Sequence, residues 1–258
     1  MLSGADLDAR AALVEELAEW AVERIVSVRP TADQIATKTS AADWVTETDL
    51  AVERRVRQVV HERFPRDRVV GEEYGATDAA EPPATWYVDP VDGTTNFVHG
   101  LPFSSFSIAV VDDDGTAVGA VADPYRSEIL SAVRSQGARR NGDPIHCADS
   151  ETLVGGIFLT ELSMQSLWPG QVTLMASLAA QGCVTRILGS NALSLASVGA
   201  GRALATIVDF NLVDGQAGTL VAREAGADVR FEGTGVLCAA PGVADEVARL
   251  WREARNGH

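Results

Sequence analysis

The hydrophobic and polar positions of the first 64 residues follow the period of an α-helix. Between residues 6 and 28, apolar side chains recur every three or four positions, as they do along the buried face of an amphipathic helix. Asp6 is the predicted N-cap and Pro30 ends this helix, since proline removes a backbone donor and clashes with the preceding turn. A second amphipathic helix is predicted from about residue 50 to residue 64, where Pro65 ends it.

After residue 65 the pattern changes to short apolar runs bounded by turn residues, which is typical of strands. Strands are predicted over residues 68–71, 85–88, 106–111, 117–121 and 128–133. The acidic segment 112–115 ends in glycine and predicts the turn of a hairpin between two of them. From residue 155 on, strands alternate with helices. The strands are predicted at 155–160, 184–188, 204–208 and 235–239, and the helices at 172–180, 192–199, 215–225 and 243–253.

This order of elements predicts a layered α/β (α+β) fold, because helices and sheets bury their apolar faces against one another. The first half contributes helices and a mainly antiparallel sheet, and the second half alternates strands with helices. At 258 residues the chain is long enough for one sizeable domain. We therefore expect a single domain over residues 1–258, built from two packed halves at about 1–150 and about 151–258.

The amino-acid composition limits which binding partners and which cellular compartment we expect for this protein. The hydrophobic share is 46%, and no window approaches the roughly 18 consecutive apolar residues of a membrane span. The N-terminus has neither the basic nor the apolar region of a secretory signal. A formal charge of −15 argues against binding to nucleic acid or anionic membranes. The three cysteines lie far apart, which is typical of reduced thiols, and together these features predict a cytoplasmic protein.

The most informative segment is residues 86–103, in which polar residues follow a buried strand. Asp89 and Asp92 come at the strand's exit, Gly93 allows a tight turn, and Thr94 follows as a helix or turn cap. Carboxylates beside exposed backbone N–H groups provide a place for a hard divalent cation together with a phosphate. The segment therefore predicts a site for phosphoryl chemistry.

A covalent aspartyl-phosphate mechanism is excluded by the same segment. Phosphatases of that kind need a nucleophilic Asp two residues before the Asp of Asp-Gly-Thr. Pro90 occupies that position here and has no nucleophile.

The segment 86–103 closely resembles the signature of the inositol monophosphatase family, whose members are Mg²⁺-dependent, lithium-sensitive phosphatases. Four other parts of the chain resemble the same family. They are the Gly-Glu-Glu motif at 71–73, the Thr-x-x-Asp segment at 46–49, the segment at 188–196 that contains Asn191, and the Asp214 helix that ends in Glu-Ala-Gly at 224–226. The resemblance implies the αβαβα sandwich shared with fructose-1,6-bisphosphatases, and a homodimer.

The resemblance also implies a metal site and its ligands. Two or three Mg²⁺ ions are expected, with Mn²⁺ as a substitute, since an all-oxygen ligand set suits these ions better than Zn²⁺. The expected metal ligands are Glu72, Asp89, the Val91 carbonyl, Asp92 and Asp214.

The catalytic and phosphate-binding roles follow from the same resemblance. Asp49 and Thr94 are expected to orient and activate the attacking water, with Glu72 as a base partner. Thr46-x-x-Asp49 also fits a helix capping box, and one Asp can serve in both roles. The residues expected to hold the phosphate and the substrate are Asp92, Gly93, Thr94, Asn191 and Asp214.

The resemblance is weakest at the positions that are expected to determine substrate specificity. Family members carry a Glu about seven residues before the Asp at 214, which is expected to hold the inositol hydroxyls. This chain has Ile207 there, or Val208 if one residue is deleted, and Asp209 is the nearest acid. The predicted function is a Mg²⁺-dependent phosphomonoesterase acting on a small polyol or sugar phosphate. Histidinol phosphate, fructose 1,6-bisphosphate and a 3′-phosphoadenosine nucleotide stay open as substrates, and so does a non-catalytic descendant that binds metal or ligand.

Overall fold

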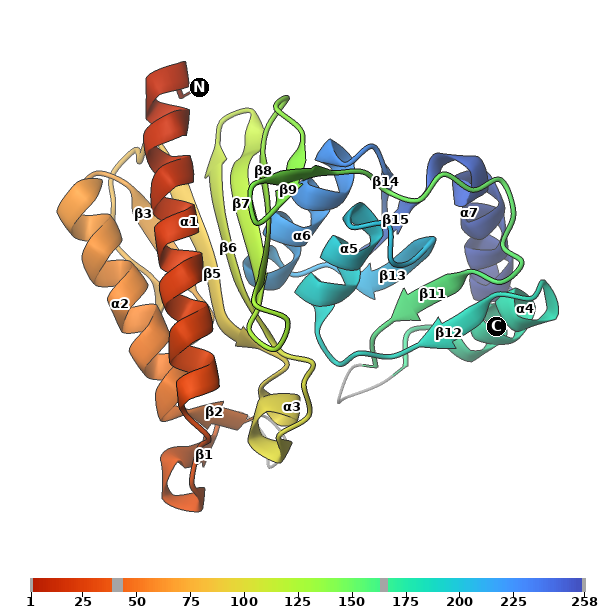
Figure 1. The fold of residues 1–258 in the computed structure, drawn as a ribbon, viewed down its shortest axis with the longest axis horizontal. Helices are drawn as coiled ribbons and strands as arrows, with labels where there is room; N and C mark the ends of the chain where they lie inside the picture. Colours follow the sequence, from red (N-terminus) through yellow and green to blue (C-terminus); the bar gives the residue numbers. More distant parts are fainter. Residues whose placement is uncertain (1, 39–43, 163–166, 257–258) are drawn as a thin grey trace.

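The computed structural model describes residues 2–38, 44–162 and 167–256, and its helices and sheets form five layers (Figure 1). Two helices cover the outer face of a large sheet, two lie between the sheets, and two cover the outer face of a smaller sheet. In that order the pairs are α1 (Gly4–Ser27) with α2 (Glu47–Arg63), α5 (Asn191–Gly199) with α6 (Leu212–Glu224), and α4 (Gln171–Ala180) with α7 (Pro241–Asn256). The predicted αβαβα sandwich is confirmed.

The larger sheet has eight strands and is almost wholly antiparallel. Across the sheet the strands are β10 (Asp143–Ile145), β9 (Ala138–Arg140), β8 (Glu128–Val133), β7 (Gly115–Asp123), β6 (Ser105–Asp112), β5 (Thr85–Asp92), β3 (Arg68–Gly71) and β4 (Gly75–Ala76). The exception is the pair β3 and β5, which run parallel, with Gly71 beside Val88. Because β3 ends beside Val88, the residue that follows β3 lies beside Asp89, in the last part of β5.

The smaller sheet has five strands and packs one face on the central helices α5 and α6. Its order is β12 (Val184–Arg186), β11 (Ile157–Thr160), β13 (Ala205–Asp209), β15 (Gly235–Ala239) and β14 (Asp228–Glu232). The first three strands run parallel. Helix α5 begins after β12 and helix α6 after β13. Ligands of open α/β sheets bind outside such carboxyl ends, so this edge is where a site is expected.

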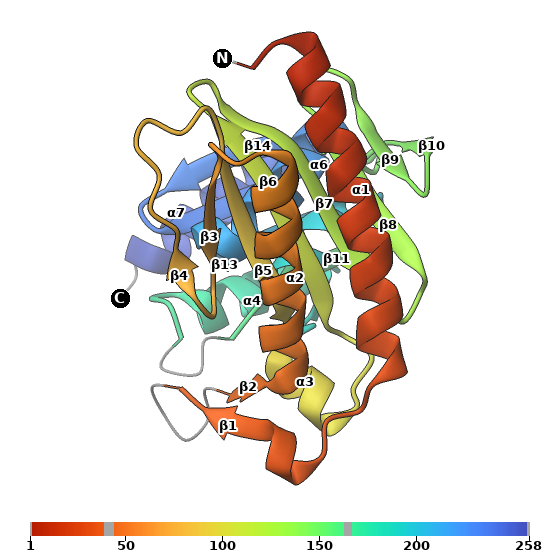
Figure 2. The same cartoon turned by 90° about the vertical axis from the view of Figure 1, so that its left-hand side faces the viewer.

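A small group of elements lies at one end of the molecule, near the ends of β5 and α1 (Figure 2). It contains the short helix η1 (Ala32–Gln34), the two-stranded sheet of β1 (Ile35–Thr37) and β2 (Trp44–Thr46), and helix α3 (Thr94–His99). The ring of His99 packs on Trp44 with centroids 5.3 Å apart. This contact places the His99 ring against the two-stranded sheet, since Trp44 belongs to β2.

Apolar packing holds the layers together. Leu13, Leu17 and Ile25 of α1 are buried against the large sheet, and Val247 and Trp251 of α7 against the small one. Within the described ranges, no helix is both long enough and apolar enough to cross a membrane.

The start of α1 corrects one prediction from the sequence. The N-cap is Ser3, not Asp6, because the Ser3 hydroxyl accepts the Asp6 N–H while the Asp6 carboxylate accepts the Ser3 N–H. Asp6 is therefore the third helical residue of a capping box. The strands that the sequence pattern missed are short or lie at sheet edges: β1, β2, β4, β9, β10 and β14.

Candidate functional site

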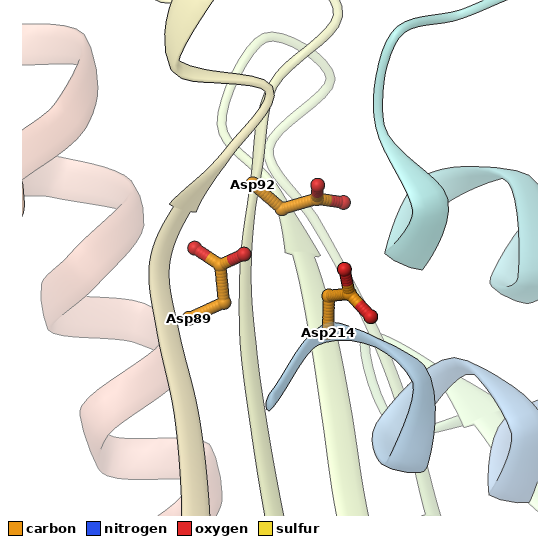
Figure 3. A group of neighbouring side chains, drawn as sticks. All are labelled: Asp89, Asp92 and Asp214. Atoms are coloured by element: carbon orange, nitrogen blue, oxygen red, sulfur yellow. The ribbon is translucent and has the colours of Figure 1, made fainter. Parts of the chain in front are cut away.

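Three buried aspartates from both halves of the chain converge between the large sheet and the middle layer of helices (Figure 3). Asp89 and Asp92 lie at the end of β5, and Asp214 lies in the first turn of α6. Each offers a carboxylate oxygen, and these oxygens all lie within 4.8 Å of one another. Asp214 Oδ1 is buried and has no hydrogen-bond partner among the residues that the structure describes. An orphaned oxygen at the centre of a carboxylate cluster is the expected state of a cation ligand.

An irregularity in β5 turns its two aspartates to the same side. Asp89 pairs with Ser107 and Asp92 with Ser105, so three steps along β5 match two steps along β6. In a regular strand residues three apart face opposite sides of the sheet. The extra residue of a bulge reverses that alternation. Asp89 and Asp92 therefore both face the middle layer of helices (Figure 3).

The N-terminus of α5 joins the two halves at this site. Asp92 Oδ2 accepts hydrogen bonds from the Ser190 hydroxyl at 2.5 Å and from the Ala192 N–H at 2.7 Å. The first residue of the helix, Asn191, donates from Nδ2 to Asp214 Oδ2 at 3.1 Å. Because a helix N-terminus carries partial positive charge, α5 stabilises the carboxylate of Asp92 and aligns Asp214 beside it.

Glu72 follows β3 and therefore lies next to Asp89, as the parallel pairing of β3 with β5 requires. Its partly exposed carboxylate accepts from Lys38 Nζ at 2.8 Å, and Glu73 accepts from the same ammonium at 2.6 Å. Burial favours a lower pKa for Lys38, but Glu72 and Glu73 outweigh it and raise that pKa above its usual value. Lys38 was not predicted as a site residue, although it precedes the Thr46–Asp49 segment in the sequence.

Asp49 has one oxygen in a helix cap and the other toward Thr94. Its Oδ2 accepts the Thr46 N–H at 2.9 Å, which confirms the predicted capping box. Its Oδ1 lies 3.4 Å from the Thr94 hydroxyl, and that hydroxyl lies 3.0 Å from the Val91 carbonyl oxygen. The cap thus fixes a fully buried carboxylate whose second oxygen remains directed at the end of β5.

Gly93 permits a close approach between the two halves. It has a φ of 89°, which favours glycine. A Cβ at this position would lie 2.7 Å from the Gly189 carbonyl oxygen and 2.9 Å from that of Phe103. The loop before α5 therefore packs directly on the turn between Asp92 and Thr94.

The carboxylates of the site have raised pKa values because they are buried together. Burial raises the pKa of Asp49 and of Asp92 to about 6 in each case. Burial, followed by the charge of Glu72, raises the pKa of Asp89 well above its usual range. Burial, followed by the charge of Asp92, does the same for Asp214. Like charges in a low dielectric disfavour ionisation, and a divalent cation would remove that penalty. The oxygen-only donor set fits Mg²⁺.

Glu161 is a partly buried acid near the site that the sequence patterns did not single out. It directly follows β11, and its carboxylate accepts from the Leu188 N–H at 3.2 Å, from the Gly189 N–H and from the Ser194 hydroxyl. Burial raises the pKa of Glu161 to about 7. Its place at the carboxyl end of a parallel strand was the signal that could have identified it.

The positions near the expected substrate-binding Glu lie in the core. Ile207 and Val208 are each 1% exposed and belong to apolar clusters. Asp209 is exposed, and its carboxylate accepts from the Thr234 hydroxyl at 3.2 Å. An acid introduced at position 207 would therefore be buried among apolar side chains.

Comparison with known proteins agrees with this geometry. The model of the inositol monophosphatase family matches residues 6–253. An inositol monophosphatase from Mesembryanthemum crystallinum is 38% identical over 168 residues, which are 62% of each chain. The Nus factor SuhB of Pasteurella multocida is 37% identical over 197 residues, 75% of this chain and 74% of that protein. The Thermotoga maritima IMPase superposes with a TM-score of 0.86 at 28% identity, over 96% of this chain and 99% of that chain.

By its fold, the chain belongs to the same class of five-layer sandwich as the Thermotoga maritima IMPase. Within that fold class, the chain belongs to the inositol monophosphatase family.

Proposed function

We propose that this protein is a Mg²⁺-dependent phosphomonoesterase that hydrolyses a small polyol or sugar phosphate. The observation that carries the proposal is the convergence of Asp89, Asp92 and Asp214, with one oxygen of Asp214 left without a partner. A buried group of like charges is costly in a fold unless a cation balances it. Membership of a family of phosphatases agrees with this role.

Five groups would hold the metal ions: Glu72, Asp89, the Val91 carbonyl, Asp92 and Asp214. When bound, Mg²⁺ supplies Lewis acidity that neutralises the phosphate and lowers the pKa of a bound water. Two or three ions fit the family resemblance, and Mn²⁺ is the expected substitute because it accepts the same oxygen ligands.

The other roles belong to the chain's own groups. Asp49 and Thr94 orient the attacking water, because the Thr94 hydroxyl lies between Asp49 Oδ1 and the Val91 carbonyl oxygen. A pKa of about 6 for Asp49 suits a group that accepts a proton near neutral pH. Glu72 is the base partner. The phosphate is held by the backbone N–H groups of Gly93 and Thr94 and by the side chain of Asn191.

The substrate class is proposed from the resemblance, because the described residues show no acid in the place expected for binding inositol. Histidinol phosphate, fructose 1,6-bisphosphate and a 3′-phosphoadenosine nucleotide are the alternatives. We also propose a homodimer acting in the cytoplasm, from the family resemblance and the composition. Static light scattering tests the dimer, and a mass of one chain would contradict it.

A second role comes from the similarity to proteins named Nus factor SuhB. Such a role would add a macromolecular partner, and the formal charge of −15 disfavours contacts with nucleic-acid phosphates. A non-catalytic descendant has even less support, because the carboxylates of the site are all retained. Mg²⁺ binding without turnover of any phosphate ester would favour it over an enzyme.

Phosphate release from a panel of esters, with Mg²⁺ and with EDTA, tests the proposal. The panel contains inositol 1-phosphate, histidinol phosphate, fructose 1,6-bisphosphate and a 3′-phosphoadenosine nucleotide. Asp214→Asn should abolish release, whereas Asp78→Asn, which changes an exposed acid outside the site, should leave it unchanged. Release that persists in EDTA would contradict the proposal.

A further inference from the structure

Glu53 is a fully buried carboxylate that lies one turn after Asp49 on α2 and is not one of the converging acids. Its two oxygens accept the Glu73 N–H at 2.7 Å and the Tyr74 N–H at 3.1 Å. They also accept Arg57 Nε at 2.7 Å. Burying a carboxylate costs several kcal/mol unless it is paired and hydrogen-bonded, and here these three donors satisfy it.

The groups that Glu53 binds belong to the turn that carries Glu72. On one side of this turn, the Glu72 N–H donates to the Val88 carbonyl at 3.1 Å, which ties it to β5. On the other side, Glu53 takes the next two N–H groups, and Arg57 donates to the Gly75 carbonyl. The backbone around Glu72 is therefore held between β5 and α2.

Gly71 shows how closely the carboxylate approaches the turn. A Cβ at position 71 would lie 2.1 Å from Glu53 Oε1, well inside contact distance. The turn therefore admits the Glu53 carboxylate only because residue 71 is glycine. A contact this close leaves the turn little freedom to shift relative to α2.

We propose that Glu53 is a positioning residue for the metal centre: by binding the N–H groups of Glu73 and Tyr74, it fixes the Glu72 carboxylate beside Asp89. The proposal rests on the proposed function, in which Glu72 is a metal ligand. Helix α2 then contributes twice to one site, since Asp49 is directed at Thr94 and Glu53 at the turn that carries Glu72.

The measurement is direct Mn²⁺ binding by electron paramagnetic resonance, without substrate, to the whole protein. Glu53→Gln replaces one acceptor oxygen by an NH₂ group, which cannot accept a backbone N–H. We expect Mn²⁺ affinity to fall about tenfold or more, as is usual when a partner of a metal ligand is removed. Glu62→Gln is the matched control, because Glu62 lies on the same helix, is exposed and accepts a hydrogen bond from Gln58 on that helix. Its Mn²⁺ affinity should equal that of the wild type.

A double-mutant cycle with Glu72→Gln separates positioning from stability. If Glu53 acts through Glu72, Glu53→Gln should lower Mn²⁺ affinity much less in the Glu72→Gln background. An equal loss in both backgrounds would overturn the proposal. So would a folded Glu53→Gln variant that loses thermal stability but keeps wild-type Mn²⁺ affinity, because Glu53 would then only attach the helix to the sheet.

Glu53→Asp keeps the test decisive if the glutamine variant does not fold. Its carboxylate is one methylene shorter and cannot reach both N–H groups from the same backbone position. We expect weaker Mn²⁺ binding, and wild-type affinity in this folded variant would overturn the proposal. A wild-type protein that binds no Mn²⁺ would instead overturn the proposed function, and this inference with it.

Discussion

Replacing a proposed metal ligand should stabilise the protein in the absence of Mg²⁺, and Asp92→Asn is the clearest case. Burial raises the pKa of Asp92 from 3.8 to about 6, which is a shift of about 2 pKa units. At neutral pH and above, where Asp92 is ionised, this shift measures how much folding disfavours its charged form. At about 1.4 kcal/mol for each unit, the penalty is about 3 kcal/mol. An asparagine has no charge and avoids it.

The hydrogen bonds of the site allow this replacement. The Ser190 hydroxyl and the Ala192 N–H both donate to the same oxygen of Asp92, and the amide oxygen of asparagine can take that place. The NH₂ group of the asparagine then faces the carboxylates of Asp89 and Asp214, where the wild type has a second negatively charged oxygen. The raised pKa of Asp92 already includes the opposing effect of these hydrogen bonds, which favour the charged carboxylate. The expected gain is therefore the whole penalty of about 3 kcal/mol, or about 6–12 °C in Tm for a chain of this size.

The assay is thermal unfolding in EDTA at pH 8 and at pH 4. Because the folded pKa of Asp92 is raised above 3.8, its penalty is absent below that pH and complete above about pH 6. The variant should therefore exceed the wild type at pH 8 and differ little at pH 4. Asp78→Asn, at an exposed acid, should change nothing at either pH. An Asp92→Asn protein no more stable than the wild type in EDTA at pH 8 would refute the reasoning.

Three further outcomes are expected. Mg²⁺ at about 100 times its Kd should stabilise the wild type by about 2.7 kcal/mol and raise its Tm. The same Mg²⁺ concentration should raise the Tm of Asp92→Asn far less. Equal Tm shifts in the two proteins would contradict the assignment of Asp92 as a metal ligand. Asp49→Asn should lower kcat by about 10²–10⁴-fold, as loss of a proton acceptor does, while Mn²⁺ affinity changes little; a normal kcat would remove Asp49 from the mechanism. Ile207→Glu should lower the free energy of unfolding by about 3 kcal/mol or more, since it buries an unpaired carboxylate in the core. It should not raise activity on inositol 1-phosphate. A stable variant with raised activity would show that position 207 reaches the substrate.

Local interactions explain why part of the site could be predicted from the sequence. The capping box of Thr46 and Asp49 spans four residues, and its hydrogen bonds form within that segment. Asp89 and Asp92 lie at the end of a buried strand that the sequence predicts. The sequence therefore gives their place in the sheet but not which face of the sheet their side chains point to. The layered fold was predictable from the change of period along the chain and from the family resemblance.

Contacts between distant segments were not predictable. The bulge in β5 that turns Asp89 and Asp92 to one side depends on the register with β6. The hydrogen bond from Ser190 to Asp92 joins residues 98 positions apart, and those of Glu161 join β11 to the loop before α5. No local pattern encodes such pairings, so the contacts of Ser190 and Glu53 become visible only in the folded chain.

The central claim is that the carboxylates of this site bind Mg²⁺ and that phosphate-ester hydrolysis depends on it. The most direct test is the initial rate of phosphate release from the preferred ester as a function of Mg²⁺ concentration, for the wild type and for Asp214→Asn. The account predicts no release in EDTA, a saturable rise with Mg²⁺ for the wild type, and a flat response for the variant. A wild-type rate independent of Mg²⁺, or an Asp214→Asn protein with wild-type kinetics, would contradict it.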